Sequence, residues 1–217
     1  MTEHYKTRIN NFSKNIANNM AQLEPYYNYK FYLFCQQKIL VDEILDCLLI
    51  GLNQASIVLT NHLLERMLKF SLINSEMRGL HVGDSDFNSK YNEAEAKYDG
   101  EDLSKNINTA FAKEIINEEE KKELLSLKDK FRNPYSHANI TKILKDIPQN
   151  TIGLMYSFSE VKDALQKSED IPQGQEIEIP TNIMAQYNQK DIADDSAFEY
   201  FRKIFGVMCK IEERNIE

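Results

Sequence analysis

The sequence predicts an all-α protein, an up-and-down helical bundle with one long polar loop and a partly extended insertion before the C-terminal helix. Apolar residues recur every three or four positions over most of the chain, which is the spacing of helices with one buried face. Several of the seven glycines and five prolines fall between these stretches. At 217 residues and 42% hydrophobic content, we expect one domain, residues 1–217.

The first half of the chain shows three helical stretches. An N-terminal helix is expected within residues 1–24, and Pro25 opens a second at 26–50, where Gly51 ends it. A third helix is expected at 54–73; it is apolar over most of its circumference and should be largely buried. The apolar stripe of the N-terminal helix comprises Tyr5, Ile9, Phe12, Ile16, Met20 and Leu23.

The middle of the chain begins with a polar, glycine-containing stretch at 77–102, which predicts a long loop. A helix follows at 104–116. The next helix begins after Asn117, which forms a capping-box pattern with Glu120, and it runs to Arg132.

The last third of the chain is more varied. A helix at 134–147 completes the bundle core, which we place at 26–147. Residues 148–190 form an irregular insertion, and residues 191–217 carry the C-terminal helix, whose apolar positions lie within 195–213. Inside the insertion, the sequence favours a strand at 151–158, a helix at 159–167 and a strand within 171–180.

The candidate site is the segment Arg132-Asn133-Pro134-Tyr135-Ser136-His137. Arginine is a permanent planar cation that fits phosphate oxygens, and histidine is the side chain best suited to proton transfer near neutral pH. Asparagine can orient a nucleophile or donate to an oxyanion. Together, Arg132, Asn133 and His137 suit cleavage of a phosphodiester without a metal, and we predict that they are catalytic.

The proline in this segment predicts its local structure. Proline disfavours helical geometry in the residue before it, so the incoming helix should stop at Asn133. Asn133 is then an N-cap, Pro134 begins the outgoing helix, and His137 lies one turn inside it. Free amide groups at such a helix start favour an anion. Between positions 126 and 145, five basic residues against one acidic residue give a net charge of +4, within a chain of net charge −8.

With this motif the chain resembles the HEPN superfamily. Its members are helical bundles marked by an arginine, a polar residue such as asparagine, and a histidine four to six positions after the arginine. The segment Leu64-Glu65-Arg66-Met67-Leu68-Lys69 also resembles the second helix of such bundles, which contains an acidic residue. The resemblance covers roughly residues 26–147 and the final helix.

The resemblance implies a metal-independent endoribonuclease without a cofactor, often part of a toxin–antitoxin, phage-defence or RNA-processing system. The implied partners are RNA, a second copy of the chain in a homodimer that brings two motifs together, and an antitoxin or defence-system protein. Carried over to this chain, Arg132 and His137 would be catalytic, with Asn133 assisting them. We also expect Glu65 and Ser136 to be supporting residues of the site. Asn139 stands where some members carry a tyrosine that a partner enzyme modifies, so that variant is not expected.

Other interpretations of the same residues stay open. Arg132 can simply cap a helix, His137 can be a satisfied core histidine, and some members of the superfamily bind or scaffold without catalysis. Glu65 can orient Arg132 across the bundle or join His62 in a buried network; the second histidine of a zinc site is missing, so no metal is expected. The aromatic cluster at 26–32 is expected in the core or a dimer interface rather than stacked on bases.

Composition narrows the class of protein. A net charge of −8 argues against a general nucleic-acid coat protein. No apolar run is long enough to span a membrane, and the N-terminus lacks the layout of a signal peptide. The three cysteines, Cys35, Cys47 and Cys209, are odd in number and lack metal-site spacing. They favour reduced thiols and a cytoplasmic location. Because no apolar run is long enough to span a bilayer, no membrane partner is expected.

Overall fold

The computed structural model describes residues 2–137, 139–167, 170 and 173–216. These residues are mainly helical, as predicted, with one two-stranded sheet. They form two compact units that are described separately: Met1–Asn139 with Lys190–Glu217, and Ile140–Gln189.

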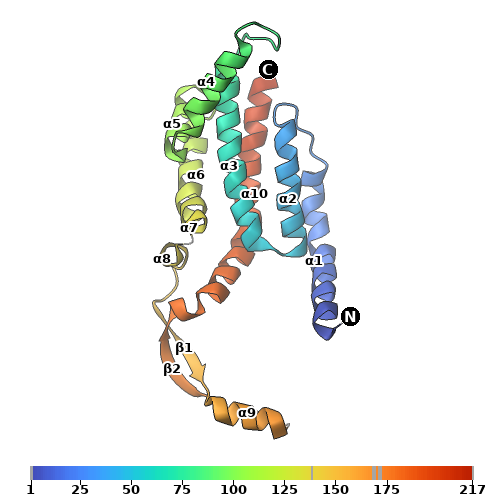
Figure 1. Cartoon of the computed structure of the whole chain (residues 1–217), viewed down its shortest axis with the longest axis vertical. Helices are drawn as coiled ribbons and strands as arrows, with labels where there is room; N and C mark the ends of the chain where they lie inside the picture. Colours follow the sequence, from blue (N-terminus) through green and yellow to red (C-terminus); the bar gives the residue numbers. More distant parts are fainter. Residues whose placement is uncertain (1, 138, 168–169, 171–172, 217) are drawn as a thin grey trace. The chain divides into compact units, whose positions relative to one another are not determined.

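The first unit is a bundle of helices. In the view of Figure 1, α3 and the C-terminal part of α10 run through its middle, with α1 and α2 on one side and α4 to α7 on the other. The elements are α1 (Glu3–Tyr27), a short 3-10 helix (Cys35–Gln37), α2 (Lys38–Ile50), α3 (Asn53–Glu76), α4 (Phe87–Asp99), α5 (Leu103–Ala112), α6 (Glu118–Leu127), a π-helical turn (Lys128–Arg132), α7 (Asn133–Ser136) and α10 (Ala185–Ile216). Of α10, the part from Lys190 onward belongs to this unit.

The core of this unit is built mainly on α3 and α10. α3 confirms the helix predicted at 54–73, and both of these helices bury large apolar side chains completely because they are surrounded by other helices. The fully buried apolar residues of these two helices include Ile57, Leu63, Leu64, Met67, Leu68, Leu72, Phe201, Ile204, Met208 and Ile211.

Two helix ends agree with the sequence prediction. Gly51 adopts the left-handed conformation, at φ 79°, that lets the chain turn after α2. The capping box at the start of α6 is complete, because the Asn117 side chain accepts from the Glu120 N–H and the Glu120 carboxylate accepts from the Asn117 N–H.

The predicted boundary between the first two helices is wrong. α1 continues through Pro25 to Tyr27, and α2 begins only at Lys38. The ring of Tyr26 packs edge-on against Phe201 and Phe205 of α10, with centroids 5.5 and 5.0 Å away, and this contact holds the last turn of α1 despite the proline. Of the apolar stripe predicted on α1, only Leu23 is fully buried.

A buried carboxylate stabilises the non-helical segment that follows α1. Glu212 of α10 is 2% exposed, and it accepts hydrogen bonds from the backbone N–H groups of Tyr32, Leu33 and Phe34. These bonds satisfy donors that would otherwise bond within a helix, so residues 28–34 do not need helical geometry. The rings of Tyr29 and Phe31 pack on Phe205, which confirms a core location for part of the aromatic cluster.

The prediction of a loop at 77–102 is also wrong, because α4 lies within it. Phe87, Tyr91, Ala94 and Tyr98 stand at helical spacing, and the last two are buried. The remaining positions are almost all polar, and so the helical pattern was missed. Tyr98 and Lys97 of α4 contact Glu76 at the end of α3.

The second unit contains the insertion. It comprises α8 (Ile140–Ile143), β1 (Asn150–Met155), α9 (Phe158–Lys167), β2 (Gln175–Pro180) and a 3-10 helix (Thr181–Met184). β1 and β2 pair antiparallel, with Asn150 opposite Pro180. These elements confirm the two strands and the short helix predicted there; Ile171 and Pro172, at the start of the second predicted strand, lie outside the described residues. Large apolar side chains such as Ile152, Leu154 and Phe158 stay exposed.

We expect replacement of Glu76 by Gln to destabilise the protein at pH 7 by about 1 kcal/mol, a value reduced for solvent screening. Hydrogen bonds from Tyr98 and Lys97, with a further one from Lys113, lower the pKa of Glu76 from its usual 4.5 to about 2. A lowered carboxyl pKa contributes stability that is complete above pH 4.5 and disappears as the pH falls towards 2.

The measurement is urea unfolding of wild type and Glu76→Gln at several pH values between 7 and 3. The difference in unfolding free energy should shrink below pH 4.5. Glu95→Gln, an exposed substitution on α4, is the matched control and should show no such trend. An effect of Glu76→Gln that stays constant down to pH 3 would contradict the assignment.

Candidate active site

The motif lies near the end of one continuous helix rather than between two helices. α6 passes without a break through the π-helical turn Lys128–Arg132 into α7. Asn133 has helical dihedral angles, φ −65° and ψ −47°, so it is not the predicted N-cap. The helix predicted at 134–147 is also wrong, because α7 ends at Ser136 and a separate short helix, α8, begins at Ile140.

The π-helical turn explains how the helix passes Pro134. In an α-helix, the proline ring would clash with the carbonyl group four residues earlier, that of Lys130. Here the N–H of Asn133 donates to the carbonyl of Lys128, five residues earlier, so the turn is wider than an α-helical turn. The helix ends shortly afterwards, where the N–H of Asn139 donates to the Pro134 carbonyl at 2.8 Å.

This geometry changes the electrostatics expected at the motif. His137 directly follows the last residue of α7 and its side chain is exposed, so it does not lie on the apolar face of a helix. The motif stands at the C-terminal end of the helix, where carbonyl groups rather than amides are free. The predicted anion site at a helix N-terminus is therefore absent, and side chains would have to bind a phosphate.

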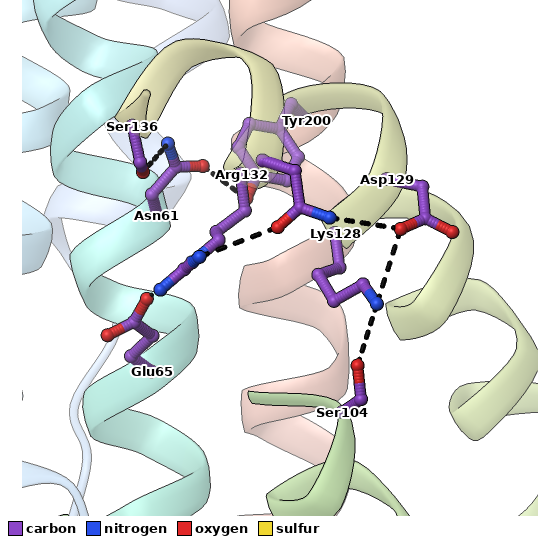
Figure 2. Close-up of polar contacts among 9 residues, drawn as sticks. Asn61, Glu65, Ser104, Lys128, Asp129, Arg132, Ser136 and Tyr200 are labelled. Carbon is purple, nitrogen blue, oxygen red and sulfur yellow. Dashed lines mark hydrogen bonds and ion pairs between the residues drawn. The ribbon is translucent and has the colours of Figure 1, made fainter. Parts of the chain in front are cut away.

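Arg132 is oriented by an ion pair across the bundle. Its Nε donates to Oε1 of Glu65 on α3 at 2.7 Å (Figure 2), which is one of the two roles that the sequence leaves open for Glu65. The Arg132 side chain is 25% exposed and that of Glu65 is 28% exposed. An ion pair this accessible contributes about 0–1 kcal/mol to stability, so its main effect is to fix the direction of the guanidinium group.

Asn133 links the motif to the π-helical turn. Its Oδ1 lies 3.4 Å from Nη1 of Arg132, and its Nδ2 donates to Oδ1 of Asp129 at 3.1 Å. Asp129 also pairs with Lys128, whose Nζ donates to Ser104 of α5 at 2.7 Å (Figure 2). Charges of both signs thus follow one another along the widened turn, and two of its positive charges are already paired, Lys128 with Asp129 and Arg132 with Glu65.

A second polar connection holds the end of the motif helix. The Tyr200 hydroxyl of α10 donates to Oδ1 of Asn61 at 2.9 Å, and Nδ2 of Asn61 donates to Oγ of Ser136 at 3.2 Å (Figure 2). Asn61 is 2% exposed and Tyr200 1% exposed. Burial raises the pKa of Tyr200 well above its usual range, so its hydroxyl remains a proton donor.

The structure therefore brings together four of the five predicted site residues. Arg132, Asn133 and Glu65 are in hydrogen-bond contact, and Ser136 is tied to α3 by Asn61, one turn before Glu65. His137 is adjacent to Ser136 in sequence, but no hydrogen bond joins it to Arg132 or Asn133 within the described part of the chain. No sequence pattern predicted the contact between Asn61 and Tyr200, because the two residues are 139 positions apart.

The remaining predictions about site chemistry concern metals, thiols and membranes. Glu65 pairs with Arg132, and among the described residues no three His, Cys, Asp or Glu side chains gather closely enough to hold a metal ion. All three cysteines are free, as expected. Within the described ranges, every helix is too short or too polar to cross a bilayer.

Comparison with protein-family models gives no match, and comparisons with curated proteins and with solved structures give none either.

We expect Tyr200→Phe to destabilise the protein by about 1–3 kcal/mol, because it leaves the buried Asn61 oxygen without a donor. Tyr135→Phe is a matched comparison. The Tyr135 side chain is also buried, but its hydroxyl finds no hydrogen-bond partner in the described part of the chain. Removal of the Tyr135 hydroxyl should leave the free energy of unfolding unchanged or slightly increased. Urea unfolding of both variants tests the difference; equal losses would contradict the role assigned to the Asn61 connection.

Proposed function

We propose that the chain is a metal-independent endoribonuclease of the HEPN type, acting as a homodimer in a toxin–antitoxin or phage-defence role in the cytoplasm. The observation that carries this proposal is the Glu65–Arg132 ion pair, together with an exposed histidine, His137, five positions after Arg132 in the chain. The ion pair fixes a guanidinium through Nε, and Nη2 makes no hydrogen bond in the described ranges, so that it is free to meet a phosphate oxygen.

In the proposed reaction, both the attacking oxygen and the leaving oxygen belong to the RNA substrate. The ribose 2′-hydroxyl attacks the adjacent phosphorus and loses its proton, while the bond to the 5′-oxygen breaks and that oxygen gains a proton. The products are a 2′,3′-cyclic phosphate and a 5′-hydroxyl. His137 would transfer one of the two protons, and Arg132 would stabilise charge on the phosphoryl oxygens. Asn133 would donate to a phosphate oxygen or position the hydroxyl.

A second candidate function is a non-catalytic HEPN-like module that binds RNA, a nucleotide or a protein partner. One observation favours it. The helix N-terminus expected beside the phosphate is absent, and the Glu65 carboxylate already neutralises Arg132. An arginine with a purely structural role would make the same ion pair. Activity measurements separate the two candidates.

We expect His137→Ala to lower the rate of RNA cleavage by a factor on the order of 10²–10⁴, because it removes a proton-transfer group. The fold should be retained, since the side chain is exposed. Arg132→Lys should also lose activity, because a point charge does not reproduce the planar fork. The experiment incubates total RNA with wild type and variants in EDTA, with thermal melting as the folding control. Full cleavage by folded His137→Ala, or cleavage that EDTA abolishes in wild type, would refute the mechanism.

We expect a homodimer in which two copies of the 132–137 segment face a shared cleft. Cleavage requires both a base and an acid, and each chain offers one histidine in its motif. A two-fold axis supplies the second, and symmetric dimers are the commonest assembly. Light scattering at micromolar concentration measures the mass directly. A monomer throughout this range, or a dimer whose motifs point apart, would refute the prediction.

A further inference from the structure

A pocket of about 410 Å³ lies where the start of α2 faces the middle of α3, on residues that the candidate active site does not use. This volume is within the range of small-molecule sites. The short helix before α2 contributes Gln36 and Gln37, α2 contributes Ile39, Leu40 and Glu43, and α3 contributes Leu59, His62 and Arg66.

The α3 side of the pocket offers positive charge. His62 and Arg66 are four residues apart, so their side chains leave the same face of the helix about 6 Å from each other. Within the described part of the chain, Arg66 makes no ion pair with any carboxylate, and both side chains are exposed. An unpaired guanidinium beside an imidazole is suited to bind the oxygens of a phosphate group.

The opposite side of the pocket offers acceptors. Oε1 of Gln37 is buried and has no hydrogen-bond partner among the residues that the structure describes. Leaving a buried acceptor unpaired is unfavourable, and rotation about the terminal torsion of glutamine, which is soft, can turn this oxygen towards a ligand. The Glu43 carboxylate is a further acceptor in the same pocket and would repel a second anion there. This side therefore favours a neutral ligand group that carries N–H donors.

Apolar side chains line the same pocket. Leu40 and Leu59 are half-buried, and Ile39 is 70% exposed at the rim. A flat, weakly polar ring placed against them would remove apolar surface from water, which is favourable. The lining thus offers a cationic contact for a phosphate, apolar surface for a ring and acceptors for an N–H donor.

We propose that this pocket binds a nucleotide whose base carries an exocyclic amino group, with the phosphate at Arg66 and His62 and the amino group at Gln37 and Glu43. The nucleotide is either a free monophosphate or one residue of an RNA strand. The Glu43 carboxylate can only accept, so it selects adenine or cytosine over uracil, which presents a carbonyl oxygen at that position, and the unpaired Gln37 oxygen is a second acceptor. Binding here does not depend on RNA cleavage.

The test is calorimetric titration of the full chain, in EDTA, with AMP, CMP, UMP and adenosine. AMP and CMP should bind at least roughly tenfold more tightly than UMP, because uracil leaves the acceptors unpaired. AMP should bind at least roughly tenfold more tightly than adenosine, which lacks the charge-assisted hydrogen bonds. The absence of binding up to several millimolar, or equal affinities for CMP and UMP, would overturn the proposal.

Two variants with a matched control assign the binding to this pocket. Arg66→Gln should weaken AMP binding about tenfold or more and leave adenosine unchanged. Arg78→Gln, at another exposed arginine, should change neither. Gln37→Leu removes the unpaired acceptor without creating a new one, so it should retain stability and reduce the preference for CMP over UMP. Wild-type affinity for AMP in Arg66→Gln would refute the site.

The source of the nucleotide is decided by a further titration with a 2′-O-methyl tetraadenylate, which cannot be cleaved through its 2′-oxygen. Binding that Arg66→Gln weakens would support a base subsite for RNA, whereas binding of AMP alone would support a free nucleotide as the ligand. A chain that binds AMP through Arg66 but cleaves no RNA would retain this proposal and refute the proposed activity.

Discussion

The geometry of the candidate site depends on the buried side-chain amide of Asn61. It accepts a hydrogen bond from Tyr200 on α10 and donates one to Ser136 at the end of the motif helix. A buried amide is costly when either end is unpaired, so α3, α10 and α7 are favoured in the register that completes both bonds. Glu65 lies one turn further along α3, and the same register brings its carboxylate to Arg132.

The parts of the fold that could be predicted are those decided by neighbouring residues. The capping box at Asn117 and the left-handed Gly51 depend on contacts within a few positions, and both were predicted. The effects of Pro25 and Pro134 on their helices were predicted wrongly, because other interactions compensate for each proline. A π-helical turn accommodates Pro134, and aromatic packing of Tyr26 on α10 holds the turn at Pro25. That packing joins residues far apart in the sequence, which no local pattern reveals.

The same distinction applies to the site. The sequence predicted that Glu65 needs a partner, because it is an acidic residue on a largely buried helix, and Arg132 was one of the two partners left open. The position of His137 was not predictable. It depends on where α7 ends, and the end of α7 depends on how the helix passes Pro134. Asn61 carried no mark of its role in the sequence, since its partner Tyr200 belongs to the last helix.

Glu65 has two opposite effects on a phosphate at Arg132. It fixes the guanidinium group in one direction, but its negative charge also opposes the approach of an anion, and the whole chain has a net charge of −8. Arg132 alone is therefore a weak attractor for RNA, and a bound strand would need further contacts. Arg66 follows Glu65 directly on α3, so its side chain leaves the helix about 100° away, towards the pocket beside α2. One face of α3 would then orient Arg132 through Glu65, and the adjacent face of the same helix would bind a neighbouring nucleotide through Arg66.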